Sequence, residues 1–288
     1  ISKSELDRAV DRILAEVHNT HGSVITFSDH LIPQLSKLLE ENELELSLAV
    51  NDREIISVLP PDSRLVGYAV DIGTTKIAGF LVDLTTGQTL ASVGATNPQI
   101  AYGEDIINRI KFANENPQGG KILQAILVQT VNSILEELRL LGNVSRDQIV
   151  DAVMVGNTAI HHMLLGLPVK PLGTAPYQTP ATQSMVIHAR DIGIMIAEGA
   201  SIYLPPNIAS FIGGDHVAML LSTEARNRGG TILAVDIGTN TEISLINNNR
   251  HYSCSCASGP AFEGAHIREG MRAIPGAIEK MLIDGEVT

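Results

Sequence analysis

The chain has 288 residues, of which 44% are apolar, so it is long and apolar enough to bury a core and suggests about two domains. Its formal net charge of −12, its lack of Trp and its 3% of aromatic residues argue against a nucleic-acid partner, because binding nucleic acid needs cationic and stacking side chains. No apolar run approaches the roughly 18 residues of a membrane span, the mixed charges at the N-terminus do not fit a signal peptide, and two cysteines do not make a disulfide scaffold, so we expect a soluble cytoplasmic protein.

Residues 1–61 are predicted to form a separate small α+β domain that links or docks the rest of the chain. The expected elements are helices over 4–17 and 31–39 and strands over 44–50 and 54–59. Pro60-Pro61-Asp62 marks the boundary of this domain. It holds no motif that we can connect to chemistry.

Residues 65–230 are predicted to form the first of two α/β lobes. The expected elements are hairpin strands through Ala95 with a turn at Thr85-Thr86-Gly87, helices over 103–113, 120–141 and 214–227, and a buried strand over 150–155. Gly142 is expected to end the second of these helices, and Asn157 to cap the helix that follows the buried strand.

A repeated motif dominates the chain. Residues 65–83 read LVGYAVDIGTTKIAGFLVD, and residues 231–246 read TILAVDIGTNTEISLI. Each copy is an apolar run, then Asp-Ile-Gly-Thr, then a second apolar run, which predicts a strand, a tight turn and a strand. We expect the second copy to open a second lobe at residues 231–288, and the two lobes to close on one nucleotide.

The residue types at the two turns are those of a phosphate site. Glycine lets the backbone approach a ligand closely, and threonine hydroxyls beside backbone amides can cradle phosphate. A bare carboxylate there would repel phosphate, so the aspartates imply a bridging Mg²⁺. The residues expected to cradle phosphate are Gly73, Thr74, Thr75, Gly238, Thr239 and Asn240. Asp71 and Asp236 are expected to hold Mg²⁺ through water and to be needed for hydrolysis.

Paired hairpins of this type resemble the superfamily of sugar kinases, heat-shock ATPases and actin. The resemblance implies an actin-like ATPase fold of duplicated ribonuclease H-like lobes, which here follows the small α+β domain. The match narrows to the ATP-dependent reductive activators of corrinoid proteins, which four segments resemble: residues 97–110, 155–167, 204–218 and 257–279. It runs from about Gly67 to the C-terminus, and the last segment is its most specific part.

This family resemblance implies a function. ATP hydrolysis would drive an electron from a low-potential donor into an inactive cob(II)alamin-type cofactor on a corrinoid protein of a methyl-transfer system. Family members also carry an N-terminal ferredoxin-like domain with a [2Fe–2S] cluster, and a full second lobe cannot be built from the residues after Asp236. We therefore expect a fragment that lacks both parts, which leaves adenosine binding and homodimer formation open.

Asp215 lies at the Gly-rich start of a predicted helix, and its role has two interpretations. It resembles the acid of sugar kinases, so it can orient the attacking water, or it can simply cap its helix by accepting backbone N–H bonds. Glu104 and Asp105 also open a helix, and a role for them through Mg²⁺-bound water is a second choice.

Three further features bear on a candidate site. Gly259 follows the second hairpin, where it can allow close approach of phosphate. His161 and His162 are expected to pack or to face a partner, because adjacent helical residues point about 100° apart and rarely share a metal ion. Cys254 and Cys256 share one face of a strand, which suits a pair of cluster ligands, although cysteine is also common as a small buried residue.

Two rival functions fit the same fold. One is a small-molecule, sugar-type kinase with Asp215 as the base, and the other is a nucleotide-gated assembly protein. The agent that stimulates ATP turnover separates them: a corrinoid protein, an alcohol or self-assembly.

Overall fold

The computed structural model describes residues 2–21, 25–41, 45–248, 250–259 and 278. By its packing the chain divides into two units, Ile1–Ala218 and Met219–Thr288, which are described separately. Most of the segment 257–279, the most specific part of the family resemblance, lies outside the described residues. The predicted division into three domains stays a prediction.

The elements are as follows. The helices are α1 (Lys3–His21), α2 (Ile32–Glu40), α3 (Ile106–Glu115), α4 (Gly119–Gly142), α5 (Thr158–Leu164) and α6 (Gly214–Ser222). Short 3₁₀ helices are η1 (Asp29–Leu31), η2 (Pro98–Tyr102), η3 (Arg146–Gln148), η4 (Lys170–Leu172) and η5 (Ala189–Ile192). The strands are β1 (Thr26–Phe27), β2 (Ser47–Asn51), β3 (Glu54–Leu59), β4 (Val66–Ile72), β5 (Lys76–Asp83), β6 (Thr89–Thr96), β7 (Ile149–Gly156), β8 (Met185–His188), β9 (Ser201–Leu204), β10 (Thr231–Ile237), β11 (Asn240–Asn247) and β12 (Arg250–Ala257).

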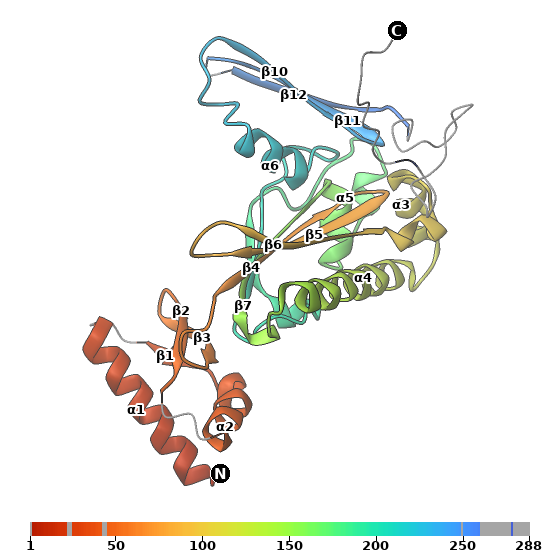
Figure 1. Ribbon diagram of the computed structural model, residues 1–288. Helices are drawn as coiled ribbons and strands as arrows, with labels where there is room; N and C mark the ends of the chain where they lie inside the picture. The colour runs from red at the N-terminus through yellow and green to blue at the C-terminus, as the bar shows by residue number, and fades with distance from the viewer. Residues whose placement is uncertain (1, 22–24, 42–44, 249, 260–277, 279–288) are drawn as a thin grey trace. The chain divides into compact units, whose positions relative to one another are not determined.

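The N-terminal block has its own small core. Helices α1 and α2 pack against a three-stranded sheet of order β1-β3-β2 (Figure 1). The two helices and the strands β2 and β3 were predicted from the sequence, whereas β1 was not. The block is also fastened to the rest of the first unit. The Ser57 hydroxyl donates to the Asp147 carbonyl at 2.8 Å, and the Gly199 amide donates to the Ile56 carbonyl at 3.2 Å.

The first unit is built on a six-stranded sheet of order β6-β5-β4-β7-β9-β8. Strands β4, β7 and β9 are parallel, whereas β5, β6 and β8 run antiparallel to their neighbours. The order β6-β5-β4-β7-β9 is the ribonuclease H-like arrangement that the actin-like fold implies, so the expected fold class is confirmed. Strands β8 and β9 were not predicted from the sequence.

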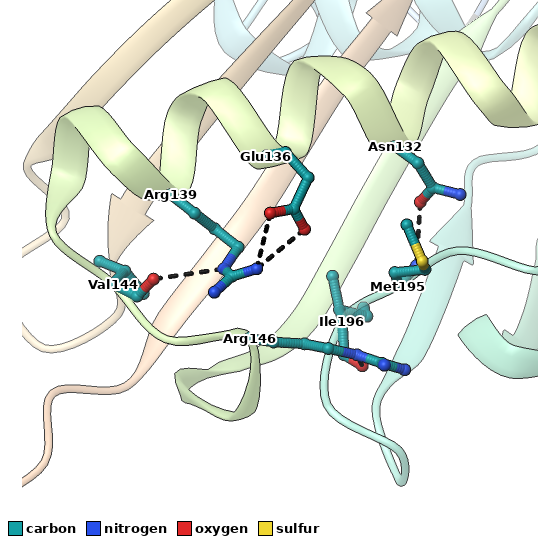
Figure 2. A network of polar contacts seen from close by, with 7 residues as sticks. All are labelled: Asn132, Glu136, Arg139, Val144, Arg146, Met195 and Ile196. Atoms are coloured by element: carbon teal, nitrogen blue, oxygen red, sulfur yellow. Dashed lines mark hydrogen bonds and ion pairs between the residues drawn. The ribbon is translucent and has the colours of Figure 1, made fainter.

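Helix α4 covers one face of this sheet and packs against β5 and β6 (Figure 1). Its buried apolar stripe follows the predicted helical spacing and includes Leu123, Leu127, Val131, Leu135 and Leu138. Figure 2 shows a polar network at its C-terminal half: Arg139 Nη1 lies 2.8 Å from Glu136 Oε1, and Arg139 Nε donates to the Val144 carbonyl at 3.3 Å. The Met195 amide also donates to Asn132 Oδ1 at 2.9 Å, which ties the 189–196 segment to α4.

Several predicted helix ends were wrong, among them the end of α1, which continues to His21 and does not stop at residue 17. Helix α3 begins at Ile106, not at residue 103, because Asp105 Oδ1 accepts a backbone N–H bond at 2.8 Å and caps it. Helix α4 includes Gly142, and Asn143 takes the left-handed cap conformation with φ 49°. Helix α6 ends at Ser222, well before residue 227, and Glu224 lies just beyond it at φ 51°.

The second unit holds an antiparallel sheet of order β10-β11-β12. Its small core contains Leu220, Ala225, Ala234 and Ile246. The hairpin predicted from the second repeat is therefore confirmed. Across both units, none of the described helices is both long and apolar enough to cross a membrane.

Candidate functional site

The first repeat places its turn at the carboxyl end of β4. Asp71 lies on β4, exposed, and is paired across the hairpin with Ala78 of β5. A Cβ on Gly73 would stand 2.7 Å from the Lys76 carbonyl oxygen, so only glycine lets this turn close. From the sequence, we expected Gly73 to allow close approach of a ligand. The structure shows that glycine is also needed at this position for the turn itself to close.

Buried hydrogen-bond donors bind the carbonyl oxygens of the turn from the interior side. Asn97 Nδ2 donates to the Gly73 carbonyl at 2.9 Å, and Arg109 Nη2 donates to the Thr74 carbonyl at 2.6 Å. The Asn97 amide donates to the Thr75 carbonyl at 2.9 Å. In a planar trans peptide the C=O and N–H bonds point in opposite directions. The amides of Thr74 and Thr75 are therefore directed away from the interior, as a phosphate cradle requires.

The turn is connected to the neighbouring strand and to α6. Asn157 caps α5, as predicted, and its Nδ2 lies 3.2 Å from Thr74 Oγ1. Gly213, just before α6, packs so closely that a Cβ would stand 2.2 Å from the Gly156 carbonyl oxygen. The first unit therefore brings Asp71, the 73–75 turn and the start of α6 to one end of the sheet. Asp215 lies on that first turn of α6.

The two interpretations of Asp215 remain open. Asp215 Oδ1 accepts the backbone N–H of His216 at 2.8 Å, a contact that suits a group at a helix start. The Asp215 carboxylate also lies at the end of the sheet that carries the 73–75 turn, which suits a group that orients water at that site. Asp105, by contrast, caps α3, because it accepts bonds from both the backbone and the side chain of Asn108.

The second turn is held by main-chain groups. The amides of Ser258 and Gly259 donate to the Thr239 carbonyl at 3.3 and 2.9 Å. The Gly238 amide donates to the Asn240 carbonyl at 3.0 Å, and a Cβ on Gly238 would stand 3.2 Å from that oxygen. Gly259 has φ +75°, which favours glycine. Gly259 therefore holds this turn in place, and its contact with phosphate stays a prediction.

Glu242 is a carboxylate that the sequence reasoning missed. It pairs across β10 and β11 with Asp236, so both carboxylates lie on one face of the second hairpin. Burial raises the pKa of Glu242, a hydrogen bond from the Ser255 hydroxyl at 2.8 Å opposes this, and the charge of Asp236 raises it further. Pairing the residues on either side of the predicted turn places Glu242 opposite Asp236 and would have identified it.

His161 and His162 pack in the interior, as expected. Both rings are buried, His161 Nδ1 lies 2.6 Å from Asn207 Nδ2, and His162 Nδ1 lies 2.7 Å from the Thr158 carbonyl. Burial lowers the pKa of both imidazoles, and these hydrogen bonds oppose the shift. Among the described residues, no three His, Cys, Asp or Glu side chains gather as a metal site.

Cys254 and Cys256 are both exposed on β12, so they are not small buried residues in this structure. Cys256 Sγ lies 3.5 Å from the Thr241 carbonyl. Their proposed use as cluster ligands is not tested by these contacts.

Comparison with known proteins gives a consistent family. Residues 66–228 match the family described as the RACo middle region, and residues 230–288 match the C-terminal ASKHA domain of RACo. The chain is 34% identical over 240 residues to the corrinoid activation enzyme RamQ of Eubacterium limosum, covering 82% of this chain and 40% of that protein. It is 29% identical over 235 residues to the [Co(II) methylated amine-specific corrinoid protein] reductase of Methanosarcina barkeri, covering 77% of this chain and 42% of that protein.

A solved structure agrees with these relatives. The reductive activator for corrinoid, iron–sulfur protein superposes with a TM-score of 0.80 at 32% identity, covering 94% of this chain and 44% of that one. The chain thus spans about two fifths of the length of the curated relatives that it matches.

Proposed function

This chain belongs to the RACo family of reductive activators of corrinoid proteins, and from that premise we propose that it carries the ATPase that powers such activation. ATP hydrolysis would drive an electron into the cob(II)alamin-type cofactor of a partner corrinoid protein. We expect the protein to act in the cytoplasm.

The observation that carries this proposal is the first turn. Its carbonyl oxygens are occupied by fully buried donors, Asn97 and Arg109, so two successive amides face away from the interior at the end of a parallel strand. Backbone amides arranged in this way bind anions. The same Asp-Ile-Gly-Thr motif recurs in the second unit, with its own turn fixed by Ser258 and Gly259. Closure of the two turns on one nucleotide is part of the proposal.

Magnesium fits the residues at the first turn. Mg²⁺ is usually bound by one or two carboxylates, waters and the phosphates of its substrate, without a dedicated protein cage. Asp71 offers an exposed carboxylate beside the turn, which is the type of ligand that such a site uses. Asp71 would hold the ion through water, with Asp236 contributing from the second hairpin. The ion would neutralise charge on the terminal phosphates.

We propose that the electron comes from outside this chain. A [2Fe–2S] cluster is usually held by four cysteine thiolates, and the sequence contains only two cysteines. We propose that a low-potential donor and an iron–sulfur cluster elsewhere in the natural protein supply the electron. Nucleotide-dependent movement of the lobes would then change the grip on the corrinoid partner.

The test measures cobalt reduction. The protein at its natural length is mixed with a cob(II)alamin-form corrinoid protein, a low-potential donor and Mg²⁺, and Co(I) is followed by its absorbance. Reduction should require ATP and should be lost in Asp71→Asn, because the substitution removes the charge that attracts Mg²⁺. Asp52→Asn, in the exposed turn between β2 and β3, is the matched control and should behave as wild type.

Two results would contradict the proposal. Phosphorylation of a small alcohol with no effect on any corrinoid protein would favour the kinase. ATP turnover in Asp71→Asn equal to that of Asp52→Asn would remove the first turn from the nucleotide site.

A further inference from the structure

A buried polar brace, made of Asn97, Gln99 and Arg109, lies behind the first turn. All three residues are 0% exposed. They belong to the segment 97–110, which the family resemblance singled out without explaining it. Gln99 Nε2 donates to the Leu123 carbonyl of α4 at 2.9 Å, and Gln99 Oε1 accepts from Arg109 Nη1 at 3.3 Å. The brace therefore connects the covering helix to the turn.

Arg109 is the centre of the brace. Its Nη2 donates to the Thr74 carbonyl at 2.6 Å, and its Nε donates to the Gly103 carbonyl at 2.9 Å. With Gln99, this gives the guanidinium three partners, all of them neutral. A Cβ on Gly103 would stand 2.7 Å from the Arg109 amide nitrogen and 2.8 Å from Asn108 Cβ, so the loop packs closely against the backbone of α3.

Within the described residues, no ion pair neutralises the charge of Arg109. Burial lowers its pKa to about 10, and the charge of Asp105 opposes this, so the group stays protonated at neutral pH. Burying an unpaired charge is costly, and a neutral donor could hold a carbonyl at less cost. A positive charge behind an anion site attracts the anion and so strengthens its binding.

We propose that Arg109 is a positioning residue for the terminal phosphates of the bound nucleotide. It fixes the Thr74 peptide so that the following amide faces the phosphates, and it places a buried positive charge behind the turn. The inference rests on the proposed nucleotide site at residues 71–75, and it adds a residue to that site which touches no nucleotide itself.

The experiment compares nucleotides that differ in their terminal phosphates. Affinities of the protein at its natural length for ATP and AMP, with Mg²⁺, are measured by calorimetry for wild type, Arg109→Met and Arg109→Lys. Arg139→Met is the matched control, because Arg139 also bonds a backbone carbonyl but lies at the far end of α4. Thermal unfolding of each variant reports any loss of structure.

Arg109→Met should weaken ATP binding on the order of tenfold or more, as expected for losing charge-assisted hydrogen bonds, while AMP binding changes far less. Arg109→Lys keeps the charge and loses the fork, so its ratio of ATP to AMP affinity should fall between wild type and Arg109→Met. Arg139→Met should leave the ratio unchanged. If Arg109→Met does not fold, the ratio in Arg109→Lys decides alone.

Equal loss of ATP and AMP affinity, or no loss of either, would overturn the role of Arg109 and leave the proposed function standing. A wild-type protein that binds ATP but never activates a corrinoid protein would refute the function, and the ratio would still decide on Arg109. A wild-type protein that binds no ATP would refute both.

Discussion

Replacing Gly213 with alanine should push the start of α6 away from the first turn. The new Cβ would stand 2.2 Å from the Gly156 carbonyl oxygen and 2.4 Å from Asn157 Cα, and real Cβ contacts essentially never fall below 3.0 Å. Both neighbours are backbone atoms, so a side-chain rotation cannot relieve the clash. The helix and Asp215 must shift by a large fraction of an ångström. Overpacking of this kind costs about 1–3 kcal/mol, and a displacement of about 1 Å at a catalytic site can lower turnover about 10²-fold.

Gly214 provides a matched control one residue further on. A Cβ there would meet Pro205 at 3.4 Å, which is an ordinary contact, and alanine in a helix is up to about 1 kcal/mol better than glycine. Urea unfolding and ATP turnover should therefore separate Gly213→Ala from Gly214→Ala. If the two variants had equal stability and equal turnover, the close packing of α6 against the β7–α5 junction would not matter to the site.

Two further outcomes are expected. Asp215→Asn keeps an oxygen that can cap α6, so the variant should lose little stability and little turnover if Asp215 only caps the helix. If Asp215 orients the attacking water, turnover should fall on the order of 10²-fold while nucleotide affinity stays near normal. Measuring turnover and nucleotide affinity on this variant decides between the two roles. Burial lowers the folded pKa of His161 and His162 below the value of 6.5, so the unfolded chain binds more protons as the pH falls below it. Stability should therefore decrease from pH 6.5 down toward the lowered pKa values, by up to about 1.4 kcal/mol per pH unit for each ring, and a melting temperature that stays constant between about pH 7.5 and 5.5 would contradict this.

Local patterns were enough to predict the repeated hairpins and the Asn157 cap. These features depend on residues close in sequence: alternating apolar residues specify a strand, and an Asn before an apolar run specifies a helix start. Helix ends were less accurate, because the left-handed residue that stops α4 is Asn143 and not the adjacent Gly142. Both residue types tolerate that conformation, so the sequence alone does not choose between them.

The polar residues of the brace could not be found from the sequence. Arg109 lies on α3 between Asn108 and Ile110, where a charged residue normally indicates a solvent-facing side. Its burial depends on the Thr74 carbonyl, which comes from a strand pair far away in the chain. Tertiary contacts of this kind leave no period in the sequence. The roles of Asp71, Asp236 and the threonines in binding nucleotide stay predictions.

The two turns differ in how much mutation they can tolerate. The first depends on the side chains of Asn97 and Arg109, so single substitutions there can remove a support. The second is supported by the amides of Ser258 and Gly259, and the Ser258 hydroxyl adds a side-chain bond by donating to Thr241 Oγ1 at 2.6 Å. Only proline lacks a backbone N–H. Random mutagenesis with selection for activity should therefore accept more residues at 258, where a side-chain bond to Thr241 is lost, than at 109, where three are lost, and proline at neither.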